Sequence, residues 1–340
     1  MALSRPGVIN NTSGTWAQDN ALFLKVFSGE VLTSFKRACV FEPHVQSRTI
    51  QNGRSAQFPV TGRFTAAYHT PGDLIEGQGN MAQNEVVIRI DDYLLADAQL
   101  YSLDEAKNHY DIRSIYSKEL GNALARTHDK RIAREITIGA RQGTTDLTAN
   151  LPNGLSPDDP SRTGSRIDLQ DAAPTADDYV ASVASAAEAL DEKDIPQEGR
   201  YLAVTPEIFY TLIQSSRAVN QDFNQQGVNG SYKEGQIAKL FGFNIFSSNH
   251  IAQGNVTALA GEQGYTSNGV VVPSTVNMTQ TRMLAFQQGA IGVVKLRDLS
   301  IGMTGNDYEV MYAATLMTAK LAVGVGCLRP ECCVEIYNSL

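Results

Sequence analysis

One helical signal, running from Ser102 to about Gly139, constrains the fold more strongly than any other stretch of the sequence. Ser102 and Glu105 have the spacing of a capping box, in which a hydroxyl and a carboxylate satisfy free backbone N–H groups at a helix start. Polar residues, Arg134 among them, predict that most of the helix surface is solvated. One face is apolar apart from a threonine: Ala106, Tyr110, Tyr116, Leu120, Ala123, Leu124 and Thr127. At ~1.5 Å per residue the helix would be roughly 55 Å long, about the diameter of a compact globule of this chain length. We therefore expect a flattened subunit with this helix as its spine and a bend at Gly121–Asn122.

Length and composition allow two domains or one elaborated domain with a sizeable core, since 42% of the 340 residues are hydrophobic. The formal net charge of −8 argues against tight nucleic-acid binding, which needs clustered Lys and Arg to neutralise phosphates. The four cysteines are unevenly distributed and indicate free thiols in a reducing cytosol. We expect no secretory signal, and the apolar stretch 313–328 is broken by Lys320 and shorter than the ~20 residues of a membrane span.

An arm is expected at the start of the sequence. Residues 1–19 are polar, and the following residues up to 38 predict a short helix. The apolar residues of that helix lie along one face: Phe23, Phe27, Val31, Phe35 and Ala38. A helix of this kind packs in the core of its own subunit or docks on a neighbouring chain.

Two strands are predicted after the arm, at Ser55–Val60 and Glu85–Ile90, because apolar residues alternate in both. The connection 61–84 is longer than the ~12–15 residues beyond which structureless loops are uncommon. Such a loop is either disordered or makes contacts outside its own subunit. Its five large apolar residues favour a loop that reaches onto a partner: Phe64, Tyr68, Leu74, Ile75 and Met81.

The middle of the sequence predicts an α/β unit, and its end predicts strands. After a surface loop at 143–165, helices are expected to start at Thr175 and Thr205, with strands at Tyr201–Val204 and Phe243–Phe246. A short helix is predicted at Glu234–Phe241, followed by a flexible insertion at 261–274. Four later segments are rich in residues that favour strands: Met283–Phe286, Ile291–Leu296, Tyr308–Val325 and Val334–Tyr337.

Sequence motifs for catalysis and ligand binding are absent or out of context. The glycine-rich run at 77–82 matches a relaxed dinucleotide fingerprint, but it precedes a predicted strand instead of following one and opening a helix. Neither GxxxxGK[ST] nor GxSxG occurs. The cysteines at 327–333 lack a fourth ligand with zinc-site spacing. Helix capping explains the acidic residues near Asp177 and Asp191 better than acid–base catalysis does. We expect no catalytic residue, cofactor or metal.

Five blocks of the sequence carry a family resemblance: ALFLKVFSGEVLTSF (21–35), SAQFPVTGRFTAAYHTPGDLI (55–75), DDYLLADAQLYSLDEAKNHYDIRSIYSKELGNALA (91–125), AFQQGAIGVVKLRDL (285–299) and AKLAVGVGCLRPE (319–331). In these blocks the chain is similar to the major capsid proteins of short-tailed, podovirus-type double-stranded DNA phages, including cyanophages. The middle third of the sequence matches much more loosely.

The resemblance implies an α+β fold, the tailed-phage major capsid fold of the Hong Kong 97 phage type. By analogy, the chain would divide into an N-terminal arm (1–50), an extension loop (51–97), a peripheral domain (98–175) with a spine helix at 102–140, an axial domain (176–285) and a return to the peripheral domain (286–340). The implied role is structural and not enzymatic. Hexamers and pentamers of the chain would close an icosahedral shell around double-stranded DNA, assembled in the host cytoplasm and found in the virion capsid.

The resemblance also implies partners. These are further copies of the chain, a scaffolding protein during assembly and a portal protein. The packaged double-stranded DNA would be bound weakly and without specificity. No contact with a membrane is expected. An encapsulin-like cargo shell would share the fold and stays open as an alternative. An α/β enzyme also stays open, although the motifs do not support it.

The candidate intersubunit contacts fall into two groups. On the loop they are Phe58, Arg63, Phe64, Tyr68 and Pro71, because aromatic and Arg side chains dominate interface energies. Packing within the hairpin is the alternative for each. Arg297, Arg329 and Glu331 are candidates for salt bridges within or between subunits, although exposed pairs contribute only ~0–1 kcal/mol.

Covalent cross-linking through the loop is excluded by composition. Some relatives join their subunits by an isopeptide bond from a loop lysine, but no lysine occurs between Lys36 and Lys107. We therefore expect non-covalent contacts, each burying more than ~1,000 Å².

Overall fold

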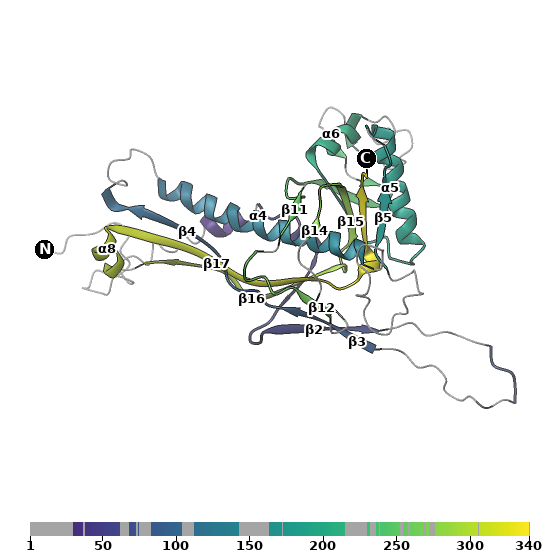
Figure 1. Cartoon of the computed structure of the whole chain (residues 1–340), viewed down its shortest axis with the longest axis horizontal. Coiled ribbons are helices and arrows are strands. Elements are labelled where there is room, and N and C mark those ends of the chain that lie inside the picture. The colour runs from purple at the N-terminus through teal and green to yellow at the C-terminus, as the bar shows by residue number, and fades with distance from the viewer. Residues whose placement is uncertain are drawn as a thin grey trace.

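The computed structural model describes residues 30–36, 38–61, 68–72, 74, 83–103, 112–142, 163–171, 173–214, 230–231, 236–237, 239–251, 254–257, 259–267, 270–271, 276–304 and 306–339. Figure 1 shows an elongated molecule in which a long helix, α4, lies above a four-stranded sheet and reaches a six-stranded sheet at its far end. Helices α5 and α6 lie beside the six-stranded sheet, and helix α8 lies at the opposite end of the molecule. The expected α+β class is confirmed.

The four-stranded sheet has the order β1-β16-β17-β4. Its strands are β1 (Gln46–Thr49), β4 (Leu94–Tyr101), β16 (Ile291–Met303) and β17 (Ala314–Cys327). β1 runs parallel to β16, and the other two pairs are antiparallel. The strands expected near the end of the sequence are confirmed, but β4 was not predicted. It forms because eight residues with alternating burial pair with residues 314–321 of β17.

Part of the strand predicted at Tyr308–Val325 is a helix. α8 (Asn306–Tyr312) connects β16 to β17. Tyr308 and Tyr312, one helical turn apart, pack with ring centroids 4.7 Å apart. Ala313, with φ of 49°, then reverses the chain into β17.

The spine is the helix α4 (Ile112–Arg141), which has 30 residues and is ~45 Å long. Ser102 and Leu103 are helical, as predicted, and residues 104–111, between them and α4, lie outside the described residues. Tyr101 still belongs to β4, and the Ser102 hydroxyl donates to the Ala313 carbonyl oxygen at 3.0 Å. Glu105, the other half of the predicted capping box, lies outside the described residues.

The environment of α4 changes along its length. Its first half has exposed and buried positions, as predicted, but every residue from 131 to 140 is buried, so the expectation that Arg134 is solvated is wrong. Sheets and loops surround this second half on several sides, and a solvated face cannot remain there. The helix is continuous through Gly121 and Asn122. A bend at this point, and its variation among copies in a shell, stay predictions.

Two helices cross at Gly121. Residues 30–36 and 38 are helical, and this short helix packs on α4. A Cβ atom on Gly121 would lie 2.7 Å from the Val31 carbonyl oxygen. The Ser34 hydroxyl donates to Asn122 Oδ1 at 2.8 Å. The alternative that this helix packs in the core of its own subunit is confirmed for the described residues, while Phe23 and Phe27 lie outside them.

The six-stranded sheet has the order β5-β18-β15-β6-β10-β9. Its strands are β5 (Ser165–Asp168), β18 (Cys333–Tyr337), β15 (Thr281–Gln287), β6 (Arg200–Val204), β10 (Phe243–Ser247) and β9 (Lys239–Leu240), and its helices are α5 (Ala176–Asp191) and α6 (Pro206–Gln214). The predicted elements here are confirmed, including the capping box of α5, in which the Thr175 N–H donates to Asp178 Oδ2 at 2.8 Å.

The helix predicted at Glu234–Phe241 is wrong. β8 (Gln236–Ile237) and β9 take its place, and β9 pairs antiparallel with β10 around Phe241 and Gly242. Both turn residues have positive φ, 47° and 83°. Two successive positive φ values are typical of a two-residue hairpin turn, so Gly242 closes a hairpin and does not end a helix.

A further sheet is built on the predicted hairpin. β2 (Ser55–Thr61) and β3 (Gln83–Arg89) pair as expected, and β12 (Tyr265–Ser267) and β13 (Val270–Val271) extend them in the order β13-β12-β3-β2. The insertion predicted at 261–274 thus contains strands. The remaining elements are β7 (Gly230–Ser231), β11 (Asn255–Val256), β14 (Val276–Asn277), η1 (Glu42–His44) and η4 (Pro330–Cys332).

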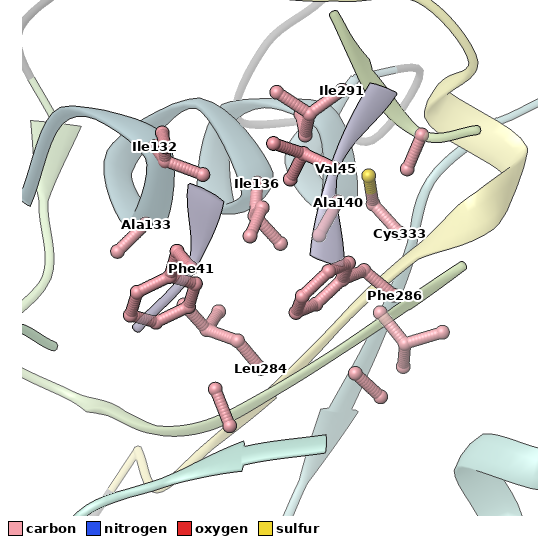
Figure 2. Close-up of a cluster of buried hydrophobic side chains, with 14 of the residues drawn as sticks. Phe41, Val45, Ile132, Ala133, Ile136, Ala140, Leu284, Phe286, Ile291 and Cys333 are labelled. Atoms are coloured by element: carbon pink, nitrogen blue, oxygen red, sulfur yellow. The ribbon is translucent and has the colours of Figure 1, made fainter. Parts of the chain in front are cut away.

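Two hydrophobic clusters share α4. The larger one surrounds its second half, where Phe41 and Phe286 lie against α4, with ring centroids 6.3 Å apart, near Ile132 and Ile136 (Figure 2). The smaller one joins its first half to the short helix and the four-stranded sheet through Phe35 and other residues. Because α4 belongs to both cores, it fixes the two main sheets relative to each other.

Candidate functional site: assembly surfaces and a buried ionic junction

A buried group of charges joins α4 to two loops. We call Asp91, Arg131, Arg134, Glu135 and Glu262 the ionic junction. Arg131 Nη1 lies 2.8 Å from Asp91 Oδ2 and 3.1 Å from Glu262 Oε2, and Arg134 bonds to the same Glu262 oxygen. The arginines come from α4, Asp91 follows β3, and Glu262 precedes β12. The junction therefore ties the root of the β2–β3 hairpin to the spine.

Burial shifts the protonation of two carboxyl groups in the junction. Desolvation raises the pKa of Glu135 to about 7 although Arg131 and Arg134 oppose the shift. Desolvation likewise raises the pKa of Asp91 to about 6, again against Arg131. Three carboxyl groups face two guanidinium groups, and Glu135 Oε2 has no hydrogen-bond partner among the described residues. Glu135 is therefore the group that holds a proton most readily near neutral pH.

A second buried ionic group fixes the end of α4 to the six-stranded sheet. The fully buried Glu335 of β18 accepts from Arg141 Nε at 2.7 Å and from Arg166 Nε at 3.0 Å. The Thr281 hydroxyl of β15 donates to the same carboxylate at 2.7 Å. These bonds join α4, β5, β15 and β18, so their role is architectural.

A hollow with a volume of about 980 Å³ lies between the short helix and strands β16 and β17. Among its charged lining residues, Glu42 and Lys295 bond to each other. Burial raises the pKa of the Cys39 thiol well above its usual range, which makes it a poor nucleophile. The hollow therefore does not present the paired nucleophile and base of a hydrolytic site.

In the described part of the chain no three His, Cys, Asp or Glu side chains come together as a metal site would require. Among the helices of the described residues, none has the length and apolarity to cross a bilayer.

The candidate contact residues on the loop differ in their burial. Phe58 is half-buried against the larger core, with the Arg48 guanidinium carbon 5.7 Å from its ring centroid. Tyr68 and Pro71 are exposed, and Arg63 and Phe64 lie outside the described residues. A single chain places none of the five loop candidates against another subunit, so their role in contacts between subunits stays a prediction.

The three charged candidates lie apart from the loop. Arg297 is exposed at an irregularity of the β16–β17 pairing. Arg329 is exposed and Glu331 is half-buried, one on each side of the start of η4. Their role in contacts between subunits likewise stays a prediction.

An exposed apolar surface was missed by the sequence analysis. We call Tyr101, Leu103, Val310, Met311 and Tyr312 the tip patch; each side chain is at least 50% exposed, and Val310 reaches 86%. The five residues are neighbours because Tyr101 pairs with Ala314 and the Ser102 N–H donates to Ala313. Residues 310–312 lie in the segment Tyr308–Val325 that the sequence predicts as strand, and apolar residues in a strand do not by themselves indicate a contact surface.

An elongated subunit with a spine helix, a β2–β3 hairpin, an exposed apolar end and architectural ionic groups has the organisation of a shell-forming protein. Its architecture is that of the tailed-phage major capsid fold. The model of the family Gp10A-like: Major capsid protein matches residues 57–337, and the chain belongs to this family. It is a major capsid protein of a tailed phage and forms an icosahedral capsid.

Individual relatives agree with this membership. The chain is 31% identical over 319 residues to the major capsid protein of Escherichia phage T7, covering 92% of this chain and 90% of that protein. The capsid structure of the cyanophage P-SCSP1u is 37% identical with a TM-score of 0.74, covering 100% of this chain and 99% of that one. A virus-like particle from Pyrococcus furiosus, at 11% identity and a TM-score of 0.54 over 92% of this chain and 99% of that one, shares the fold alone.

Proposed function

We propose that the chain assembles as hexamers and pentamers and that the tip patch is one of the surfaces through which copies meet. The observation that carries this proposal is the exposure of five large apolar side chains at one end of an elongated subunit, where α8 lies (Figure 1). Contiguous apolar patches on a protein surface mark contact sites. In this arrangement residues 98–175 and 286–340 contribute the peripheral domain, and residues 176–285 contribute the axial domain.

Further contacts and partners complete the proposal. The extension loop of residues 51–97 reaches onto a neighbouring copy through Tyr68, Pro71, Arg63 and Phe64, with Phe58 anchoring its root. A scaffolding protein guides assembly in the host cytoplasm, and a portal protein occupies one vertex. Family membership supports these partners. It also favours a phage capsid over an encapsulin-like cargo shell.

A double substitution tests the tip patch. Val310→Asp with Met311→Asp introduces charge on exposed positions of α8, so the subunit should fold while the apolar contact is lost. Co-expression with the scaffolding protein, followed by electron microscopy, should show closed shells for the wild type and a large loss of shells for the variant. Val310→Ile with Met311→Leu is the matched control, because it keeps the patch apolar. Normal shells from the Asp variant would remove the patch from the assembly contacts.

A further inference from the structure

Strand β4 forms one edge of the four-stranded sheet. All eight of its residues pair with β17, from Leu94 with Leu321 to Tyr101 with Ala314. In the described part of the chain no strand pairs with its other edge. At ~3.4 Å per residue this edge is about 27 Å long.

One hydrogen bond fixes which backbone groups point away from the sheet. The Ser102 N–H donates to the Ala313 carbonyl oxygen at 3.0 Å, so Ser102 is directed toward β17. Backbone groups alternate between the two edges of an antiparallel strand. Leu95, Asp97, Gln99 and Tyr101 therefore direct their N–H and C=O groups away from β17.

The same four residues also have exposed side chains. Burial alternates along β4, and Leu95 and Tyr101 are 54% and 50% exposed. Natural edge strands are commonly protected by proline, lysine, a bulge or shortness. β4 has none of these, and Asp97 is its one charged residue. An edge with these properties is suited to accept another strand.

We propose that β4 pairs antiparallel with β4 of a second copy across a two-fold axis, joining two four-stranded sheets into one. This inference rests on the proposed assembly and adds the strand and the register of one contact. The axis passes by Ala98, so Leu95 faces Tyr101 of the second copy and Asp97 faces its Gln99. Apolar groups meet apolar groups, and the carboxylate meets an amide that can donate to it.

Other registers of the same pairing are less favourable. A two-residue slip in one direction places Asp97 opposite Asp97 of the second copy, and like charges directly opposite are destabilising. The same slip in the other direction places Asp97 opposite Tyr101 and loses the amide partner. The register centred on Ala98 also retains the whole outward edge, with about eight backbone hydrogen bonds.

The symmetry of this pairing is compatible with a closed shell. A two-fold axis that relates adjacent antiparallel strands is perpendicular to the sheet, so both copies present α4 on the same side. Copies joined in this way share an inside and an outside. The pairing is isologous and closes after two copies.

Cysteine substitution at the axis tests the register. Ala98 lies opposite Ala98 of the second copy in a non-hydrogen-bonded pair, with Cα atoms ~4.5 Å apart, which is within the range of a disulfide. Ala98→Cys shells treated with oxidised glutathione should give a dimer on a non-reducing denaturing gel. Ala96→Cys is the matched control, since Ala96 is half-buried like Ala98 and lies ~13 Å along the strand from Ala96 of the second copy. Wild-type shells in the same oxidant control for the buried native cysteines.

The outcomes distinguish the two proposals. Shells in which Ala98→Cys stays monomeric, in which Ala96→Cys cross-links equally, or in which a ladder replaces the dimer would overturn the strand pairing and leave the assembly proposal intact. Absence of shells from the wild type with scaffolding protein would count against the assembly proposal itself.

A second pair of variants tests the strand pairing even if Ala98→Cys does not fold. Gln99→Pro removes an outward N–H and leaves the β17 ladder unchanged, because proline is tolerated at the free side of an edge strand. We expect a folded subunit by circular dichroism with at least ~10-fold fewer shells, while Gln99→Ala assembles normally. Equal shell yields from the two variants would overturn the proposal.

Discussion

Gly121 allows two helices to approach closely. A Cβ atom there would lie 2.7 Å from the Val31 carbonyl oxygen and 3.0 Å from the Phe35 backbone nitrogen, and backbone atoms cannot swing away. Gly121→Ala should therefore destabilise the subunit by about 1–3 kcal/mol, although alanine is favoured over glycine in helices by ~1 kcal/mol. Urea unfolding of unassembled protein measures this. Ala123→Gly, at an exposed position of α4, isolates the propensity term. A gain of stability in Gly121→Ala would contradict the close packing.

Glu135 makes stability depend on pH. Its folded-state pKa is raised to about 7 from an ordinary value of 4.5, so its contribution is fully present below about 4.5 and is lost as the pH rises through about 7. Glu135→Gln mimics the protonated group. It should be close to neutral at pH 5 and more stable than the wild type by about 1–3 kcal/mol at pH 8.

The measurement is urea unfolding of unassembled protein at both pH values. Asp91, Arg131, Arg134 and Glu262 face Glu135 and are common to both proteins, so their own titration largely cancels in the difference. Glu119→Gln is the control, because the Glu119 side chain is 60% exposed. A difference between Glu135→Gln and the wild type that does not change with pH would show that Glu135 is ionised throughout.

At the scale of elements, the β9–β10 hairpin depends on one glycine. Gly242 has φ of 83° and no atom within 4 Å of a built Cβ, so Gly242→Ala should cost about 1 kcal/mol by backbone strain alone. Gly254 has equal space and no positive φ, and Gly254→Ala is the matched control. Differential scanning calorimetry should show a lower Tm for the first variant alone. Equal Tm values would mean that the turn relaxes.

Sequence patterns within a short stretch of residues predicted the elements that such stretches determine. The Thr175–Asp178 cap marked α5, and alternation marked β2 and β3. β4 could not be found this way, because Leu94 and Ala96 favour helix and the strand exists through pairing with residues more than 200 positions later. The helix predicted before Gly242 failed for a related reason, since glycine ends helices and also closes hairpins.

The candidate site was less predictable than the fold. Aromatic and Arg residues on the loop follow a compositional rule, and nothing local says which of them leave the subunit. Asp91, Arg131 and Glu262 are far apart in the sequence and meet only once the hairpin and the spine have packed. The family could be identified because the blocks that carry the resemblance are long, while contacts between subunits are properties of pairs of chains.

At the scale of the whole molecule, the shell should lack covalent joints between chains. No lysine occurs between Lys36 and Lys107 to form a loop isopeptide bond, and the four cysteines are buried and free. Boiling mature shells in SDS should therefore release monomers only. A ladder of covalent oligomers would contradict this expectation.

The acidic chain should hold DNA weakly. With a formal net charge of −8, capsomers offer few clustered cations to replace the counterions of phosphates. Fluorescence anisotropy with labelled duplex DNA at physiological salt should show no tight binding. A basic control protein of similar size should bind under the same conditions, and tight binding by capsomers would reveal a basic surface that net charge conceals.

The position of β18 delays completion of the six-stranded sheet until the last strand has been synthesised. β18 lies between β5 and β15 inside the six-stranded sheet, although both neighbours precede it in the chain. β5 gains its partner, and Arg141 and Arg166 gain Glu335, only after residues 333–337 have left the ribosome. A chain released early cannot complete this sheet. A chain that lacks residues 333–337 therefore lacks the complete subunit fold from which the shell is built.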